Sequence, residues 1–433
     1  MGIRETVVQG AVEIKGLQTM SFERKITELF DADSPVAIVC STDCSTGYPV
    51  GFGVARALFD KGVKVIAVDS DRRSVARYST KVAFLHKPEV KTPDQLMDFL
   101  KIFGKMFREK PVLFLLNDED VLALSRHYDE LSAVMRLTTG RDDIRYIDKT
   151  EQYREFIDKG VPIPTTVIVT ARDDAVRISG PVGYPCIVKP PTQAAIKSRI
   201  GKKVLFCRDR SGLQDAVEKI RRVCDTFIVQ EYIPGGNDRL YTFGSYVSRD
   251  RSGIISFTGR KIRQFPPDFG SCRCGESVES SEVERSGKMA LDALRYSGIS
   301  QVEFKLDPRD GILKVMEVNG RAWLWISLAV ACGANIPFAA YCDAIGKEIP
   351  EFRQSRKRVI WINLIEDLLN SVYGYGRCGY RESSLTFGQW LKSIQGEKEF
   401  AFFSWDDPIP AFVRTVQFLG SYPRTLKQCR KAQ

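Results

Sequence analysis

Histidine is nearly absent from this sequence of 433 residues, which contains only His86 and His127. The imidazole of histidine is the side chain that enzymes use most often for general acid–base catalysis. A mechanism built on an imidazole base is therefore disfavoured, and any catalysis must rest on other groups.

Long uninterrupted apolar segments are also missing. Charged residues are scattered through residues 1–30, which therefore lack the apolar core of a secretory signal. The longest weakly polar stretch, residues 322–344, contains Asn335, Pro337 and Asp343, and this favours a buried helix over a membrane span. We expect a cytoplasmic protein.

The eleven cysteines follow no spacing typical of a metal site or of a disulfide framework. Cys272 and Cys274 form one C-x-C, and Cys40 and Cys44 lie near the end of an expected strand. The sequence has no C-x-x-C pairs that could supply a four-thiolate zinc site. We therefore expect reduced thiols with structural or incidental roles.

The composition is that of a protein with more than one buried core, because 43% of the residues are hydrophobic over a length that exceeds one ordinary domain. A net charge of +10 indicates anionic partners without choosing among nucleotides, nucleic acids, phosphorylated substrates and anionic lipid. No nucleic-acid-binding motif is present, so we expect no specific nucleic-acid partner. The basic residues 424–431 could contact an anionic membrane weakly, and self-association is left open.

The first part of the chain predicts a small doubly wound α/β domain over residues 34–140, after an N-terminal extension at 1–33. A strand at 36–40, a helix starting near Val54 and a second strand ending at Asp69 form a βαβ unit. A further apolar strand leads into the polar run NDED and a helix. The pattern is typical of a parallel sheet covered by helices.

Three glycines in the loop after the first strand offer an alternative interpretation. Gly47, Gly51 and Gly53, followed by Asp69, invite comparison with a dinucleotide-binding loop. Their spacing departs from G-x-G-x-x-G, and a parallel α/β unit needs small residues wherever its first helix approaches the sheet. A structural or substrate-facing loop is favoured over a nicotinamide site.

After residue 140 the pattern changes to short strands with fewer helices, which predicts an α+β region that continues to residue 348. The remaining segment, residues 349–433, is mixed aromatic and basic. Trp390, Trp405, Asp406 and Asp407 of this segment could shape an acceptor site or pack on the core, and packing is favoured.

The strongest group of candidate site residues lies on two expected strands that are joined by a tight turn. Glu303 is on the first strand, and Glu317 and Asn319 are on the second, where their spacing of two puts them on one face. Two carboxylates and an amide oxygen suit Mg²⁺ that bridges phosphates. Arg321 falls on the same face, where it could hold a phosphoryl group or a carboxylate. A solvated, structural pair of glutamates is the alternative.

Two further segments fit a nucleotide site. Lys189 ends an apolar strand, from which its ammonium could reach phosphate oxygens. The strand that ends at QEYIPG could present backbone groups to an adenine edge, with Glu231 or Asp238 accepting from ribose hydroxyls. Either segment alone is common in protein cores.

A basic run, Arg260, Lys261 and Arg263, follows the expected strand IISFTG. We interpret it as a loop stiffened by Pro266, Pro267 and Gly270, which would place positive charge beside a transferring phosphate. Solvated surface residues are the alternative.

These residues together resemble the ATP-grasp superfamily, over roughly residues 34–348. The branch they resemble is that of the carboxylate-amine ligases related to D-aspartate ligase and carbamoyl-phosphate synthase. The motifs occur in the family's order: Lys149 in IDKTEQY, Lys189 in IVKP, QEYIPG, Glu303 in VEFK, and Glu317, Asn319 and Arg321 in EVNGR.

The resemblance implies a Rossmann-like preATP-grasp domain followed by an ATP-grasp domain at 141–348, whose central lid subdomain spans about 150–235. It also implies an ATP-dependent ligase that activates an anionic carboxylate as an acyl phosphate and transfers it to an amine, with ATP and Mg²⁺, or Mn²⁺, bound. The implied ATP contacts are Lys149, Lys189, Gln230, Glu231, Tyr232, Ile233 and Asp238; the implied metal ligands are Glu303, Glu317 and Asn319; and the implied catalytic residues are Arg321, Arg263 and Lys261.

The sequence departs from the family in the loop that would cover the phosphates. Residues 190–203 contain a single glycine, Gly201. Four basic residues occupy this segment, which is usually rich in glycine in the family. A non-catalytic or regulatory ATP-binding protein of the same fold is therefore the alternative to a ligase. A Rossmann-type oxidoreductase would be favoured only if NAD bound and ATP did not.

Overall fold

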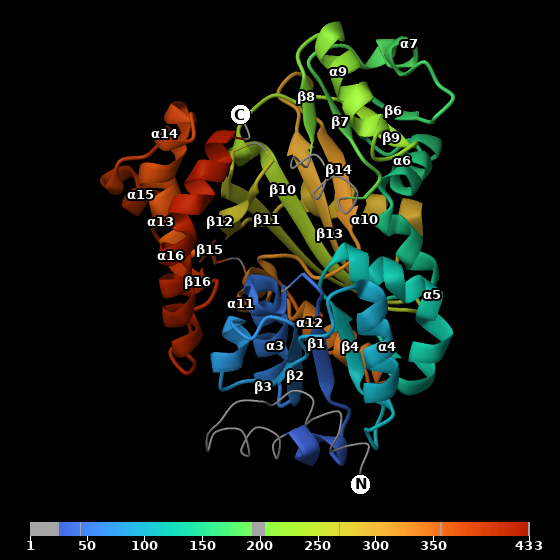
Figure 1. Cartoon of the computed structure of the whole chain (residues 1–433), viewed down its shortest axis with the longest axis vertical. Coiled ribbons are helices and arrows are strands. Elements are labelled where there is room, and N and C mark those ends of the chain that lie inside the picture. The colour runs from blue at the N-terminus through green and yellow to red at the C-terminus, as the bar shows by residue number, and fades with distance from the viewer. Residues whose placement is uncertain (1–25, 44, 193–203, 268, 356, 432–433) are drawn as a thin grey trace.

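The computed structural model describes residues 26–43, 45–192, 204–267, 269–355 and 357–431. Three β-sheets organise this part of the chain (Figure 1), and they follow one another in sequence. The candidate site lies where the three sheets meet.

A parallel sheet of five strands, in the order β3-β2-β1-β4-β5, comes first. Helices α3 (Pro49–Phe59), α4 (Pro93–Gly104) and α5 (Asp118–Val134) connect its strands, and η1 (Ser45–Gly47) and η2 (Val75–Tyr78) lie in its loops. The strands are β1 (Ala37–Cys40), β2 (Val65–Asp69), β3 (Ala83–His86), β4 (Val112–Leu115) and β5 (Arg136–Leu137). Because the strand order reverses between β1 and β4, the loops after these two strands diverge and leave a crevice for a ligand.

Helix α3 begins at Pro49, earlier than the expected start near Val54, because proline is well suited to the first helical position. The glycines of this segment serve packing. A Cβ atom on Gly53 would lie 2.8 Å from Cγ2 of Ile326, so only glycine lets α3 approach α11 (Ile326–Ala331) this closely. This packing gives Gly53 a structural role that needs no dinucleotide.

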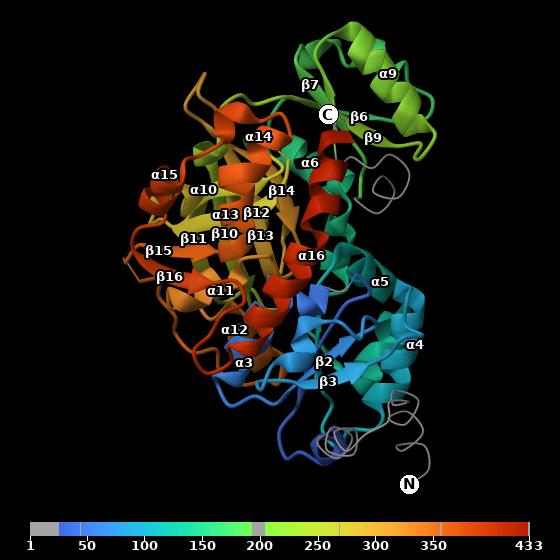
Figure 2. The same cartoon turned by 60° about the vertical axis from the view of Figure 1, so that its left-hand side comes forward.

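The second sheet is antiparallel and has four strands in the order β6-β9-β7-β8. Helix α6 (Lys149–Asp158) and η3 (Asp142–Ile147) lead into it, α7 (Ala175–Ile178) and η4 (Gly180–Val182) connect β6 to β7, and α9 (Arg210–Arg221) connects β8 to β9. Its strands are β6 (Thr166–Val169), β7 (Cys186–Lys189), β8 (Leu205–Cys207) and β9 (Phe227–Glu231). A separate apolar cluster fills the space between this sheet and α9. The sheet and its helices form the lobe at the top of Figures 1 and 2.

The third sheet has seven strands in the order β14-β13-β10-β11-β12-β15-β16. Helix α10 (Ser281–Leu294) and η5 (Asn237–Arg239) belong to the same part of the chain, as do α11 and α12 (Ile336–Ala344). Its strands are β10 (Leu240–Val247), β11 (Ile254–Phe265), β12 (Ser271–Ser277), β13 (Gly298–Leu306), β14 (Leu313–Asn319), β15 (Val359–Ile362) and β16 (Glu397–Phe400).

The C-terminal segment is part of this large sheet, because β15 pairs with β12 and β16 pairs with β15. Trp390 is buried, Asp407 accepts from Ser79 and Thr80 in the parallel-sheet domain, and Trp405 is exposed. Trp390 and Asp407 therefore pack against the rest of the protein, whereas Trp405 does not. The helices of the segment are α13 (Leu364–Leu369), η6 (Asn370–Gly374), α14 (Tyr375–Arg377), η7 (Arg381–Ser383), α15 (Phe387–Ser393) and α16 (Ile409–Lys431).

One continuous apolar cluster joins the parallel sheet to the large sheet, and it includes Val39, Phe52, Trp323 and Trp361. The two sheets are thereby held as opposite walls of one cleft. The weakly polar stretch at 322–344 forms the short buried helices α11 and α12, and none of the described helices is long and apolar enough to cross a membrane. Nine of the eleven cysteines are free thiols, while Cys44 and the side chain of Cys429 lie outside the described part of the chain.

Candidate active site

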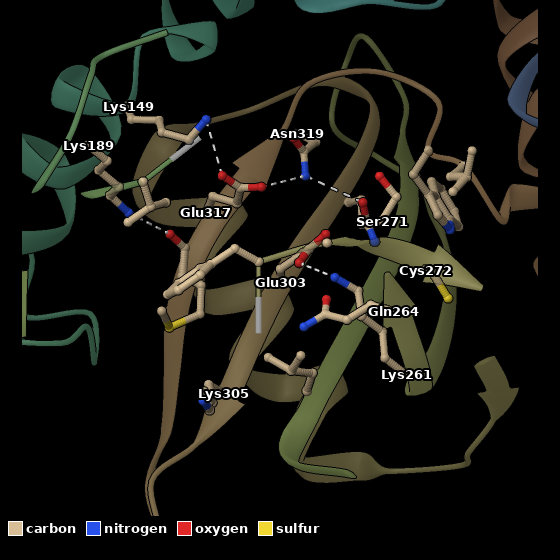
Figure 3. A pocket seen from close by; sticks show the side chains of 18 of the residues that line it. Lys149, Lys189, Lys261, Gln264, Ser271, Cys272, Glu303, Lys305, Glu317 and Asn319 are labelled. Atoms are coloured by element: carbon tan, nitrogen blue, oxygen red, sulfur yellow. Dashed lines mark hydrogen bonds and ion pairs between the residues drawn. The ribbon is translucent and has the colours of Figure 1, made fainter. Parts of the chain in front are cut away.

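A cleft of about 360 Å³ is lined by side chains from all three sheets. The four-stranded sheet contributes Lys189, and the large sheet contributes residues from β11, β12, β13 and β14. The loops after β1 and β4 close the third side with Asp43, Leu116 and Asn117. Figure 3 shows the lysine and glutamate side chains converging at the centre of this cleft.

The two glutamates face each other across paired strands, as their sequence pattern predicts. Glu303 on β13 lies opposite Glu317 on β14 in the antiparallel register, and both line the cleft. Asn319, two residues beyond Glu317, is on the same face, and its Nδ2 lies 3.4 Å from Oε1 of Glu317. The structure thus brings together two carboxylates and an amide.

Each glutamate is paired with a buried lysine. Lys149 Nζ lies 3.1 Å from Oε2 of Glu317, and Lys261 Nζ lies 2.7 Å from Oε2 of Glu303. Burial alone would raise the pKa of Glu317, but Lys149, Lys189 and Lys261 outweigh it and hold that pKa well below its usual range. Glu317 is therefore an anion at neutral pH.

No carboxylate of the described residues is in direct contact with Lys189. Its Nζ donates to the hydroxyl of Tyr153 at 2.7 Å, to Oε1 of Gln230 at 3.0 Å and to the carbonyl of Met316 at 3.4 Å. Burial lowers the pKa of Lys189 to about 7, although Glu317 acts in the opposite direction. Gln230 is fully buried, and its side chain orients Lys189. The side chain does not line the cleft, although a contact with adenine was expected of it.

The outer end of the cleft is more apolar. Tyr232 and Ile233 line it together with Ile187, Val204 and Leu240. The Tyr232 ring lies 6.5 Å from the Phe269 ring, and Lys305 Nζ lies 5.2 Å from the Tyr232 ring centroid. A flat heterocycle fits such surroundings, which offer aromatic faces and apolar side chains.

Of the two acids expected near this end, the structure places only one in the cleft. Glu231 lines it, but Oε1 pairs with Arg309 at 2.5 Å and Oε2 accepts from the Thr165 amide at 3.1 Å. Asp238 is exposed on η5 and does not line the cleft. Asp238 follows the turn after β9, in which Gly235 has a positive φ of 102°.

Arg321 lies where the large sheet meets the parallel-sheet domain. Its Nε donates to Oδ1 of Asp118 at 2.5 Å, and Nη1 donates to the Ala322 carbonyl at 3.1 Å. Asp118 is the first residue of α5, so the guanidinium links the two walls of the cleft. Its remaining amino group, Nη2, has no hydrogen bond to any residue that the structure describes.

Comparison with known proteins identifies the type of site. No protein-family model matches the chain. D-aspartate ligase from Enterococcus faecium is 23% identical over 300 residues, which cover 64% of this chain and 70% of the ligase. The carbamoyl phosphate synthase large chain, C-terminal section, from Methanopyrus kandleri is 23% identical over 312 residues, covering 68% of this chain and 54% of that one.

Solved structures agree with these relatives. N5-carboxyaminoimidazole synthetase from Staphylococcus aureus superposes with a TM-score of 0.60 at 15% identity, covering 79% of this chain and 86% of that one. Biotin carboxylase from Campylobacter jejuni superposes with a TM-score of 0.60 at 14% identity, covering 78% of this chain and 76% of that one. The chain has the ATP-grasp fold. Together with the sequence relatives, this fold indicates an ATP-dependent carboxylate-amine ligase, and the predicted α/β and α+β fold class is confirmed.

One predicted catalytic residue of this ATP-grasp chain lies elsewhere. The segment expected as a loop is part of strand β11, which has register shifts on both sides of Arg263. Strict alternation from Lys261 would put Arg263 on the cleft face, but Gln264 lines the cleft instead. Arg263 Nε and Nη2 donate to the buried carboxylate of Asp367 at 2.9 and 2.6 Å. The prediction that Arg263 faces the transferring phosphate is therefore wrong.

Replacement of Arg263 by methionine is expected to act on stability rather than on turnover. Among the described residues, it would leave the buried Asp367 carboxylate with the Trp390 indole as its one side-chain donor, at a cost of about 3–5 kcal/mol in the free energy of unfolding. Urea unfolding measures this cost, and Arg260→Met, which breaks a more exposed pair with Glu276, is the control. A folded variant with normal stability and greatly reduced turnover would contradict this structural role.

A polar network braces the crevice between β1 and β4. Asp120 Oδ2 accepts from the Thr42 amide at 2.8 Å and from Nδ2 of Asn117 at 2.6 Å, and burial raises the pKa of Asp120 to about 6. Asn117 Nδ2 also lies 3.2 Å from Oδ1 of Asp43, which lines the cleft. These hydrogen bonds hold this edge of the cleft in place.

Several cleft residues were not predicted. Gln301 and Lys305 line the cleft because they alternate with Glu303 on β13, and this spacing of two was visible in the sequence. Gln264 and Ser271 could not be recognised as cleft residues from the sequence, because the register shift in β11 and the pairing of β11 with β12 place them in the cleft. The loop expected to cover the phosphates falls mainly on residues 193–203, which lie outside the described residues.

The donor set fits a magnesium ion that shares its coordination with phosphate oxygens. Glu303, Glu317 and Asn319 offer only oxygen ligands, which Mg²⁺ prefers, and they are too few to enclose a metal alone. In agreement, the described residues contain no group of three or more His, Cys, Asp and Glu side chains that could hold one.

The unusual pKa of Lys189 leads to a prediction for nucleotide binding. With a pKa of about 7, Lys189 is largely neutral at pH 8, and a polyphosphate would favour its charged form. Binding of ADP at pH 8 is therefore expected to take up close to one proton. Affinity is expected to fall by up to about tenfold per pH unit above pH 7.

Calorimetric titration of ADP in Hepes and in Tris at pH 8 measures this uptake, because the two buffers differ in ionisation enthalpy. Lys189→Arg is the matched control, since arginine stays charged at all relevant pH values. Equal proton uptake by the wild type and the variant would show that another group titrates.

Proposed function

We propose that this chain joins a carboxylate to an amine through an acyl phosphate formed at the cleft described above. The observation that carries the proposal is the convergence of Glu303, Glu317 and Asn319 with Lys149 and Lys189 between two sheets. This arrangement provides oxygen ligands for a metal beside cations for phosphates.

ATP would lie along the cleft with its adenine at the apolar end. Tyr232 and Ile233 would contact the base, and Glu231 would accept from the ribose after releasing the Thr165 amide or Arg309. Lys149 and Lys189 would bind phosphate oxygens. Glu303, Glu317 and Asn319 would hold Mg²⁺, which offsets the charge that develops on a phosphoryl group during transfer.

The first step would be attack of a carboxylate oxygen of the substrate on the γ-phosphorus of ATP. A bond forms between that oxygen and phosphorus, the bond to the β,γ-bridging oxygen breaks, and ADP leaves. Lys261 and Arg321 would stabilise negative charge on the transferring group and on the acid. In the second step the amine attacks the acyl carbon, the carbon–oxygen bond to phosphate breaks, and inorganic phosphate and a proton are released.

The residues around Arg321 favour an anionic acid substrate. Nη2 of Arg321 could receive a carboxylate, while Asp118 fixes the orientation of the guanidinium. The crevice beside Asp43 and Asn117 is the space that the second substrate would enter. The geometry supports this division of the cleft.

Release of ADP and phosphate from Mg²⁺-ATP tests the proposal, measured across a panel of amino acids and small carboxylates with and without amines. Release that requires one acid and is lost in Glu317→Gln would support it. Tight ATP binding without release for any acid would favour the alternative, a non-catalytic or regulatory ATP-binding protein of the same fold.

A further inference from the structure

The long C-terminal helix α16 has one face packed on the protein. Phe418, Tyr422 and Leu426 are buried against Phe265 and Tyr375. Gln417 adds a hydrogen bond to the Arg73 carbonyl at 2.7 Å. These contacts hold the helix against the end of β11, helix α14 and the segment before η2, and Figure 2 shows it crossing the front of the molecule.

The face of α16 beside this packed one exposes large apolar side chains. Their spacing of three and four residues places them along a single line on the helix, which we call the apolar stripe. Exposed apolar side chains that form one contiguous patch mark an interaction surface, whereas scattered ones need no explanation. The stripe consists of Trp405 just before the helix, which is 90% exposed, and of Ile409 at 53%, Phe412 at 72%, Val416 at 56% and Leu419 at 51%.

All charged side chains of α16 are basic. Between Ile409 and Lys431 there is no aspartate or glutamate, while five residues are basic. Arg414 is neutralised by Glu366, but the other four follow the stripe toward the C-terminal end of the helix. Of these, Arg424 and Lys427 are exposed.

We propose that the apolar stripe and this basic end form a docking surface for an anionic lipid bilayer. A helix that carries phenylalanine and leucine on one face, follows a tryptophan closely, and has basic but no acidic residues, has the composition of helices that lie in the membrane interface. Anionic headgroups supply the negative charge that the basic end needs. A second copy of the helix could cover the stripe, but it offers no carboxylate to these lysines and arginines.

Vesicle flotation tests the proposal on the full chain. We expect binding to phosphatidylcholine vesicles that contain about 30% phosphatidylglycerol, and little binding to phosphatidylcholine alone. Phe412→Ser combined with Leu419→Ser should reduce the bound fraction about tenfold. Lys427→Glu should weaken binding most at low salt, and Lys61→Glu, which reverses an exposed charge elsewhere, is its control.

A matched pair of variants separates the stripe from general surface hydrophobicity. Ile409 and Ile102 are both 53% exposed, but Ile102 lies on α4 of the parallel-sheet domain, far from α16 in the sequence. Ile409→Ser should reduce flotation and Ile102→Ser should not. Equal effects of the two substitutions would overturn the proposal.

Tryptophan fluorescence reports the same contact directly. Of the five tryptophans, Trp323, Trp325, Trp361 and Trp390 are buried and only Trp405 is exposed. Anionic vesicles should shift its emission to shorter wavelength, and Trp405→Phe should abolish the shift. Absence of the shift, or a vesicle-free dimer that Phe412→Ser converts to a monomer, would overturn the proposal, and the latter would assign the stripe to contact between copies.

Discussion

Replacement of Glu317 by glutamine is expected to lower kcat for ADP release by about 10³-fold. The substitution removes one of two carboxylates that would hold Mg²⁺. It also leaves Lys149 without the carboxylate that lies 3.1 Å from its Nζ. Because Glu317 raises the pKa of Lys189, that lysine should become still more neutral and bind phosphate less well.

Steady-state kinetics at saturating Mg²⁺-ATP, with the acid identified by the panel, measure this loss. Glu397→Gln is the control, because Glu397 is an exposed glutamate on strand β16 of the same sheet. Calorimetric binding of metal-free ADP separates the two causes, since a loss of metal binding alone would leave that affinity unchanged. Turnover within tenfold of the wild type would contradict the metal-binding role of Glu317.

The centre of the site could be predicted from the sequence because local rules determine it. The alternation of side chains on a strand puts Glu317 and Asn319 on one face, and the tight turn before them makes β13 and β14 neighbours. Both rules need only a few adjacent residues. The strand end at Lys189 was recognisable for the same reason.

The errors arise where a single residue interrupts a local rule or where the partner is distant in sequence. The register shifts in β11 turn Arg263 away from the cleft, and its partner Asp367 is 104 residues further along the chain. Gln230 sits on a strand that faces the cleft, yet its amide is used to hold Lys189. No periodicity in the sequence reveals such pairings, because they depend on how separate sheets pack.

Replacement of Arg321 by lysine is expected to lower kcat/KM for the acid substrate by about 10²-fold while the affinity for ATP stays within about twofold. Lysine keeps the positive charge, so the test concerns geometry. The guanidinium binds Asp118 through Nε at 2.5 Å and still has Nη2 for a carboxylate or an acyl phosphate. A single ammonium group on a flexible stem cannot hold both positions in one fixed plane.

Asp118→Asn tests the same arrangement from the other wall of the cleft. It should raise KM for the acid more than it lowers kcat, because the guanidinium stays present but loses its orientation. Arg251→Lys is the matched control, since Arg251 is also paired with an aspartate, Asp292, but neither residue lines the cleft. If Arg321→Lys weakens ATP binding as much as it lowers turnover, Arg321 contacts the nucleotide, and the acid must bind nearer to Lys261, on the other side of the two glutamates.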